Sequence, residues 1–201
     1  WKVPLRDDVQ VATSVSAPRA GYIVPAEHAA TVARQLRLHA IAFEILDTTR
    51  SARDVEVFRA STATFAAQPF EGRMTVDLQG SWRNEKHDIA AGSLYVPIAQ
   101  SSARIIVALL EPQAPDSLAA WGVFNNAFET KEYMEDYVAE SVARSMLKND
   151  PALAATFNAK LADDKAFAAD PRARLAFFAR RHSSWDEQLD RYPVFRVAVA
   201  P

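Results

Sequence analysis

The sequence contains no cysteine, only 5 glycines and no long apolar run. The lack of cysteine excludes disulfides, thiolate nucleophiles and cysteine-ligated metal sites, although it does not fix the cellular compartment. The scarcity of glycine argues against a glycine-rich phosphate loop, and no G-x-S-x-G motif is present. The longest apolar stretch, Ala103 to Leu110, is far shorter than the roughly 20 residues of a spanning helix. We therefore expect no membrane span.

An excess of charge of one sign is also missing. The formal net charge is −2 and the isoelectric point is near 6.1, with basic residues scattered among acidic ones. This balance gives no electrostatic attraction for nucleic acid, so we expect none as a partner. The 201 residues are 49% hydrophobic and 24% charged, as in globular proteins able to bury a core. The chain starts at Trp1 without a basic and apolar leader, and we expect it to be a fragment of a longer protein.

Residues 1–112 are predicted to be rich in β-strands. Alternation of apolar and polar residues, or short runs of β-branched residues, indicates strands and favours an antiparallel sheet. Gly72 and Gly80 suit turns or bulges, and Pro97 places its strand at an edge or a bulge. The predicted strands lie in the ranges 9–15, 21–25, 41–47, 54–62, 73–82, 93–98 and 103–110, with an exposed hairpin end at 83–88.

Helical periodicity appears at 26–39 and again after Pro115. We predict helices from Asp116, as the N-cap, through Phe128 and from Thr130, as a second N-cap, to Asn149. Two Asp-Pro pairs, at 150–151 and 170–171, each place an N-cap before a proline in the first helical position. The fold class is therefore α+β, with a mainly antiparallel sheet followed by a helix-rich half. We treat residues 1–201 as one domain, strand-rich over 1–112 and helix-rich over 113–191, with a final strand at 192–199.

No metal site or serine nucleophile is indicated by the residues. The histidines, His28, His39, His87 and His182, form no H-x-x-E, H-E-x-x-H or H-x-H pair. The serine pairs at 101–102 and 183–184 are typical of turns and helix caps. We assign no catalytic and no metal-binding residue to this chain.

Glu111 and Asp116 bracket a corner that contains Pro112 and Pro115. Two carboxylates can act as acid and base when their surroundings separate their pKa values. The structural interpretation is that Glu111 ends a strand and Asp116 caps a helix, in which case replacing Asp116 by Ala lowers stability by about 1 kcal/mol.

Several aromatic side chains could line a ligand groove, although aromatic residues are more often core residues or interface anchors. The candidate interface or ligand surface consists of Tyr95, Glu111, Asp116, Trp121, Tyr133 and Tyr137.

Three long stretches carry a family resemblance: "VEVFRASTATFAAQPFEGRMTVDLQGSW", "GSLYVPIAQSSARIIVALLEPQAPDSLAAWGVFNN" and "FETKEYMEDYVAESVARSMLKNDPALAATFNAKLADDKAFAADPRARLAFFARRHSSWDEQLDRYPVFRV". Together with the opening residues they resemble the C-terminal region of bacterial zinc carboxypeptidases, which are carboxypeptidase A relatives with a long extension after the peptidase domain. In that family the zinc ligands, the substrate-binding arginine and the general base glutamate lie in the preceding domain. None of those motifs is matched here.

The resemblance implies a non-catalytic accessory domain whose partner is the N-terminal peptidase domain of the same polypeptide. It implies that zinc belongs to that missing domain and not to this chain, that the parent is a zinc-dependent carboxypeptidase, and that the location is periplasmic or secreted. An independent ligand-binding module for peptide or cell-wall material remains the alternative. A small hydrolase that uses Glu111 and Asp116 is a weaker one.

Overall fold

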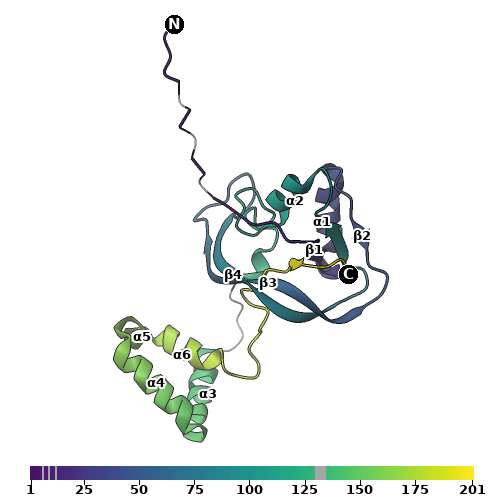
Figure 1. Cartoon of the computed structure of the whole chain (residues 1–201). Helices are drawn as coiled ribbons and strands as arrows, with labels where there is room; N and C mark the ends of the chain where they lie inside the picture. The colour runs from purple at the N-terminus through teal and green to yellow at the C-terminus, as the bar shows by residue number, and fades with distance from the viewer. Residues whose placement is uncertain (6, 9, 12, 130–134) are drawn as a thin grey trace. The chain divides into compact units, whose positions relative to one another are not determined.

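A computed structural model describes residues 1–5, 7–8, 10–11, 13–129 and 135–201 (Figure 1). The chain divides into two compact units, which we describe separately. The sheet unit comprises residues 1–129 and 188–201, and the helical unit comprises residues 130–187. The single domain expected over residues 1–201 thus contains two compact units, and the last residues of the chain belong to the first of them.

The sheet unit contains one six-stranded antiparallel sheet, with strand order β2-β5-β1-β6-β3-β4. The predicted α+β class is confirmed. The last strand is shorter than the predicted range 192–199. The strands are β1 (Gly21–Val24), β2 (Glu44–Ile45), β3 (Arg50–Phe65), β4 (Val76–Ile89), β5 (Leu94–Pro97) and β6 (Phe195–Val197).

The long β3–β4 hairpin corrects one prediction and agrees with two others. Residues 83–88 are not a hairpin end, because they lie inside β4, and the connection is instead at 66–75, where Gly72 has φ +74°. Gly80 lies opposite Ala60, beside the bulge at Ala60/Thr62, as predicted for a turn or bulge glycine. A Cβ at Gly80 would lie 2.2 Å from the Arg59 carbonyl oxygen, so the close approach of the strands requires glycine.

Two other predictions for the first half of the chain, for Pro97 and for residues 9–15, differ from the structure. Pro97 predicts an edge strand or a bulge, but β5 lies between β2 and β1 and pairs with β1 without a register shift, and the proline is tolerated because it is the last residue of the strand. The described residues in the range 9–15 belong to no strand. The described β-branched residues of this range pair with no strand of the sheet.

Each face of the sheet carries a core. Tyr22, Phe58 and Leu78 belong to the larger core, whereas Ile23, Val57 and Ile89 belong to the smaller core. Successive side chains of a strand point to opposite faces, and β1 is buried at every position because both of its faces are covered.

The helices of the sheet unit are α1 (Ala26–Leu38) and α2 (Ala103–Leu110). The first confirms the helix predicted at 26–39 and buries Val32 and Leu36. The second contradicts the strand predicted at 103–110. An eight-residue apolar run fits either structure, and here Ile106 and Leu110, four residues apart, are both fully buried while Ile105 is 41% exposed.

The helix predicted from Asp116 to Phe128 is also wrong. Residues 111–124 form turns, followed by the short 3₁₀ helix η1 (Asn125–Ala127). Two backbone hydrogen bonds tie this segment to neighbouring elements: the Leu118 N–H donates to the Leu109 carbonyl, and the Ala120 carbonyl accepts from the Val76 N–H. Gly122, with φ +73°, interrupts any helix there. Asp116 therefore caps no helix.

The helical unit contains α3 (Asp136–Asn149), α4 (Pro151–Asp163), α5 (Lys165–Ala169) and α6 (Pro171–Ala179). Side chains of Asp150 and Asp170 accept hydrogen bonds at the starts of α4 and α6, which confirms both Asp-Pro N-caps, and Asp164 caps α5. The predicted N-cap Thr130 lies outside the described residues. Phenylalanines at 157, 167, 177 and 178 pack edge-on or tilted against one another. No described helix is long and apolar enough to cross a membrane.

Candidate functional site

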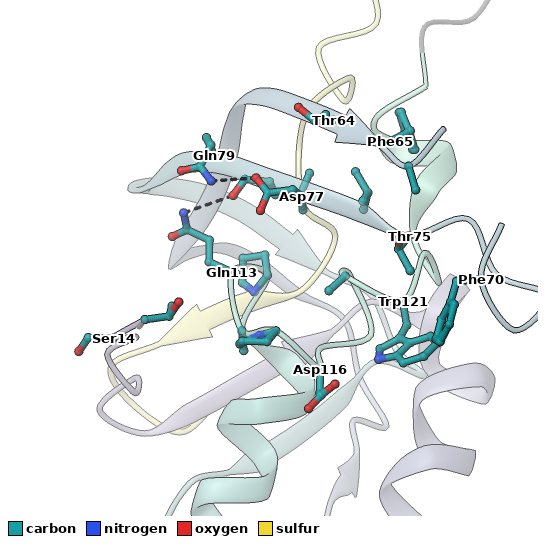
Figure 2. Close-up of a pocket in the computed structure, with 18 residues that line it drawn as sticks. Ser14, Thr64, Phe65, Phe70, Thr75, Asp77, Gln79, Gln113, Asp116 and Trp121 are labelled. Carbon is teal, nitrogen blue, oxygen red and sulfur yellow. Dashed lines mark hydrogen bonds between the residues drawn. The ribbon is translucent and has the colours of Figure 1, made fainter. Parts of the chain in front are cut away.

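A surface pocket of about 710 Å³ lies where β4 begins (Figure 2). We name it the Trp121 pocket. Its walls come from the end of β3, the start of β4, the turn between α2 and η1, and the N-terminal segment. It is lined by Thr13, Ser14, Thr64, Phe65, Ala66, Phe70, Thr75, Val76, Asp77, Leu78, Gln79, Pro112, Gln113, Ala114, Pro115, Asp116, Ala120 and Trp121.

Hydrogen bonds connect the turn to β4 beside this pocket. The Gln113 side chain donates from Nε2 to the Leu78 carbonyl at 3.3 Å, and the Val76 N–H donates to the Ala120 carbonyl at 3.1 Å. Gln113 and Ala120 thereby tie the turn to one strand, and Pro115 between them restricts the backbone.

Two aromatic rings form one end of the pocket. The Trp121 and Phe70 rings lie 6.1 Å apart between centroids and tilted by 42° (Figure 2). Phe70 is 60% exposed and comes from the β3–β4 connection, where it forms a bridge with Arg73. Asn125 supports the same connection by donating from Nδ2 to the Met74 carbonyl at 2.8 Å. A pair made of one exposed and one half-buried ring, Phe70 and Trp121, suits contact with a ligand or partner.

The charge of the lining restricts what can bind. Asp77 and Asp116 are its carboxylates, and the lining has no lysine, arginine or histidine. The Gln79 amide donates to Asp77 at 2.9 Å. Such a surface disfavours anions and suits a cation or an uncharged hydroxyl-rich group, because carboxylates, amides and indole rings all attract those.

Glu111 has a different environment from Asp116. It is 1% exposed, directly after α2, and its Oε1 accepts hydrogen bonds from the Tyr22 hydroxyl at 2.6 Å and Arg196 Nε at 2.8 Å. Its Oε2 accepts a second bond from Arg196, so the guanidinium and carboxylate form a two-point pair. Every oxygen of this carboxylate is occupied from inside the protein.

The Glu111 pair is surrounded by further contacts. Arg196 also donates to the Ser16 carbonyl at 2.6 Å and lies 4.0 Å above the Trp82 ring. The Tyr192 hydroxyl donates to the Leu110 carbonyl at 3.0 Å. Burial, with Glu111 nearby, raises the pKa of both Tyr22 and Tyr192 well above the ordinary value. Both hydroxyls therefore stay protonated and remain donors.

The sequence did not reveal Tyr22 or Arg196 as partners of Glu111. They lie 89 and 85 residues from it in the chain, and no local spacing signals such a contact. The two carboxylates of the corner at 110–116 thus have different roles. Asp116 lines the Trp121 pocket, whereas Glu111 joins β1, β6 and the end of α2 inside the unit.

The remaining candidate residues do not gather at this pocket. Tyr95 is 7% exposed in the smaller core and donates to the Ala20 carbonyl at 3.1 Å; burial, with Glu44 as a second cause, raises its pKa. Tyr137 is 74% exposed on α3 of the helical unit. Tyr133 lies outside the described residues. The structure therefore brings together only Asp116 and Trp121 from the predicted surface.

No group of three His, Asp or Glu side chains in the described part of the chain could hold a metal ion. His28 packs edge-on against Phe124, and His87 stacks on Phe195 and contacts Glu85. His182 is bonded to Ser184 in the helical unit. His28 and His87 thus pack against aromatic rings.

No family model, curated protein or solved structure matches this chain.

Proposed function

We propose that this chain is the non-catalytic C-terminal accessory domain of a zinc metallocarboxypeptidase-like protein. It would pack on the peptidase domain of the same polypeptide and help that domain to fold or shape its substrate cleft. The proposal is supported by the resemblance of three long stretches to the region that follows such peptidase domains. The zinc and its ligands would belong to the preceding domain.

The observation that carries the proposal is that Glu111 is buried and hydrogen-bonded inside the protein. A general acid or base must reach a substrate within hydrogen-bond distance, directly or through one water. Glu111 is buried and already holds Arg196 and Tyr22, so its geometry serves stability. The exposed feature beside it is a pocket with two aromatic rings, which suits binding.

The first test is to read the frame upstream of Trp1 for a domain with an H-x-x-E motif. The parent protein is then produced with and without residues 1–201. We expect the truncated parent to have a lower yield of soluble protein and a lower unfolding temperature. A parent variant with Trp121→Ala and Phe70→Ala tests the pocket, and Tyr137→Ala is the matched control for removal of an exposed aromatic ring.

Two results would contradict this function: a stop codon just upstream of Trp1, or a truncated parent with unchanged stability and activity. Stoichiometric zinc retained by the isolated chain after dialysis against a weak chelator would also contradict it, since the residues here offer no zinc centre.

The second candidate is an independent module that binds peptide or cell-wall material, and the lining of the Trp121 pocket favours it. Carboxylates and amides beside an exposed ring can recognise a lysine side chain or sugar hydroxyls. Titration with a lysine-containing peptide and with N-acetylglucosamine oligomers, followed by indole fluorescence, tests this candidate. A saturable signal that Trp121→Leu removes and Trp185→Phe keeps supports it, and no saturation with either probe excludes those ligands.

A further inference from the structure

Strand β4 forms one outer edge of the sheet. It spans Val76–Ile89 and pairs, among the described residues, only with β3. The opposite outer strand, β2, has two residues. Proteins commonly shorten or cover an edge strand, because its unpaired backbone groups otherwise pair with another chain. Here β2 is short and β4 is long.

The backbone bonds identify the groups that point outward from β4. The Phe58 carbonyl and the Ala60 N–H bond to residues 192 and 190, so even-numbered residues of β3 face β6 and odd-numbered ones face β4. Val57 pairs with Arg83, and Arg59 pairs with Ser81. Odd-numbered residues of β4 therefore face β3, and its even-numbered residues point their N–H and C=O groups away from the sheet.

The first part of this edge is already covered. The Val76 N–H bonds to Ala120, and the Leu78 carbonyl accepts from Gln113. From Gly80 onward the outward backbone groups have no hydrogen-bonding partner among the described residues. They recur at every second residue, through Trp82, Asn84 and Lys86. That spacing matches the hydrogen-bonding groups of another β-strand.

We propose that β4 pairs with β4 of a second copy of this chain, antiparallel across a two-fold axis at Asn84. The two sheets then continue as one sheet through both chains. This inference goes beyond the proposed function and does not rest on it, because it uses only the edge of the sheet.

Charge complementarity selects the register. Centring the pairing on Arg83, Glu85 or Lys86 would place each of those charges opposite its own copy, which is unfavourable. Centring it on Trp82 would bring Lys86 against Leu78, whose carbonyl Gln113 already covers. Centring it on Asn84 places Arg83 opposite Glu85 on both sides of the axis and brings no like charges face to face. A closed two-fold pair of this kind uses the same patch on both chains.

The side chains along this edge are accessible for such pairing. Arg83, Asn84 and Lys86 are exposed, whereas Glu85 is half-buried and held by Arg59 and His87. Glu85 would gain Arg83 of the second copy as a further partner. Self-association of the chain should therefore weaken at high salt, as exposed ion pairs do.

Single-cysteine variants test the register without interference, because the chain contains no cysteine. In Asn84→Cys the two copies of residue 84 would face each other with Cα atoms about 5.5 Å apart, within disulfide reach. In the control Lys86→Cys the two thiols would be separated by four residues along the strand, about 13 Å. Under mild oxidation we expect a covalent dimer of Asn84→Cys to form at least tenfold faster than one of Lys86→Cys.

Light scattering behind size exclusion measures the association itself. We expect the full chain, of 22.2 kDa, to be dimeric at high micromolar concentration, and Arg83→Glu to raise the dimer dissociation constant at least tenfold. Arg34→Glu, an exposed change on α1, is the matched control and should leave it unchanged. A monomer at all concentrations would overturn the proposal and indicate that another polypeptide covers this edge. Faster cross-linking of Lys86→Cys than of Asn84→Cys would overturn the register.

Discussion

The contacts that stabilise the sheet unit join residues far apart in the sequence, whereas those that stabilise the helical unit join residues close together. In the sheet unit Glu111 meets Arg196 across 85 residues of sequence, and β6 returns from the far end of the chain to pair with β1 and β3. In the helical unit each of α4, α5 and α6 begins at an aspartate that caps it from within three residues. The difference suggests that single changes in the sheet unit act through distant partners, whereas changes in the helical unit act locally.

The largest effect is expected from breaking the Glu111–Arg196 pair. Replacing Arg196 by Met leaves a buried carboxylate without its cation, and we expect the free energy of unfolding of the sheet unit to fall by about 4 kcal/mol. Urea unfolding followed by indole fluorescence measures it, since Arg196 lies over Trp82. Arg34→Met, on an exposed position of α1, is the control. A loss below about 1 kcal/mol, the level of an exposed pair, would show that the pair is not structural.

The core of the helical unit provides the next test. Phe178 is 3% exposed among the other phenylalanines, so Phe178→Ala should cost about 3 kcal/mol. Tyr137→Ala, at an exposed position of α3, is the control and should cost little. Amide hydrogen exchange should show the loss in α3 to α6 only. Equal loss of protection in β3 and β4 would contradict the division into separately stabilised units.

A smaller effect is expected from Glu85 and depends on pH. Hydrogen bonds from Arg59, and then from His87, lower the pKa of Glu85 from 4.5 to about 2, against the opposing effect of burial. A lowered folded-state pKa means that ionised Glu85 stabilises the fold above about pH 4.5, and this contribution is lost as the pH falls to about 2.

Glu85→Gln should therefore reduce stability by about 2 kcal/mol at neutral pH and make little difference near pH 2. Unfolding curves of both proteins across this range measure the difference, with Glu71→Gln in the exposed β3–β4 connection as control. A difference that does not change with pH would show that Glu85 acts by packing alone.

The smallest effects compare two aspartates that look alike in the sequence. Asp170 accepts from the N–H groups of Arg172 and Ala173, so Asp170→Ala should cost about 1 kcal/mol of helical-unit stability. Asp116 caps no helix, and Asp116→Ala should stay within about 0.5 kcal/mol, below what its expected N-cap role implied. Thermal unfolding of both variants checks the order. Equal losses would show that Asp116 has a structural role like that of Asp170.

The contrast between local and distant contacts also explains which elements could be predicted from the sequence. The Asp-Pro starts at 150 and 170 predicted helices correctly, because the N-cap and the proline act within one turn of the chain. The alternating residues at 54–62 and 73–82 likewise predicted two strands, and Gly72 between them predicted a turn, although β4 continues through residues 83–88, where a hairpin end was predicted. Signals that act over a few residues were sufficient for these elements.

Predictions failed where distant partners decide the structure. Residues 103–110 form a helix because Ile106 and Leu110 fit the core on one side, and no neighbouring strand is available to them. Residues 116–124 form turns instead of a helix, and two of their backbone groups bond to Leu109 and to Val76 of β4. The sequence indicated Glu111, Asp116 and Trp121 as candidates, and the structure places Asp116 and Trp121 in one pocket. The role of Glu111, however, depends on Arg196 and Tyr22, which no local pattern indicates.

The most direct test of the proposed accessory role is the binding of this chain to the peptidase domain that the proposal places upstream of it. Calorimetric titration of the purified chain into that separately produced domain should show one-to-one binding with a dissociation constant in the micromolar range or tighter. Trp121→Ala combined with Phe70→Ala should weaken it at least tenfold, whereas Tyr137→Ala should not. The absence of any binding heat at two temperatures, with both proteins folded, would contradict the account.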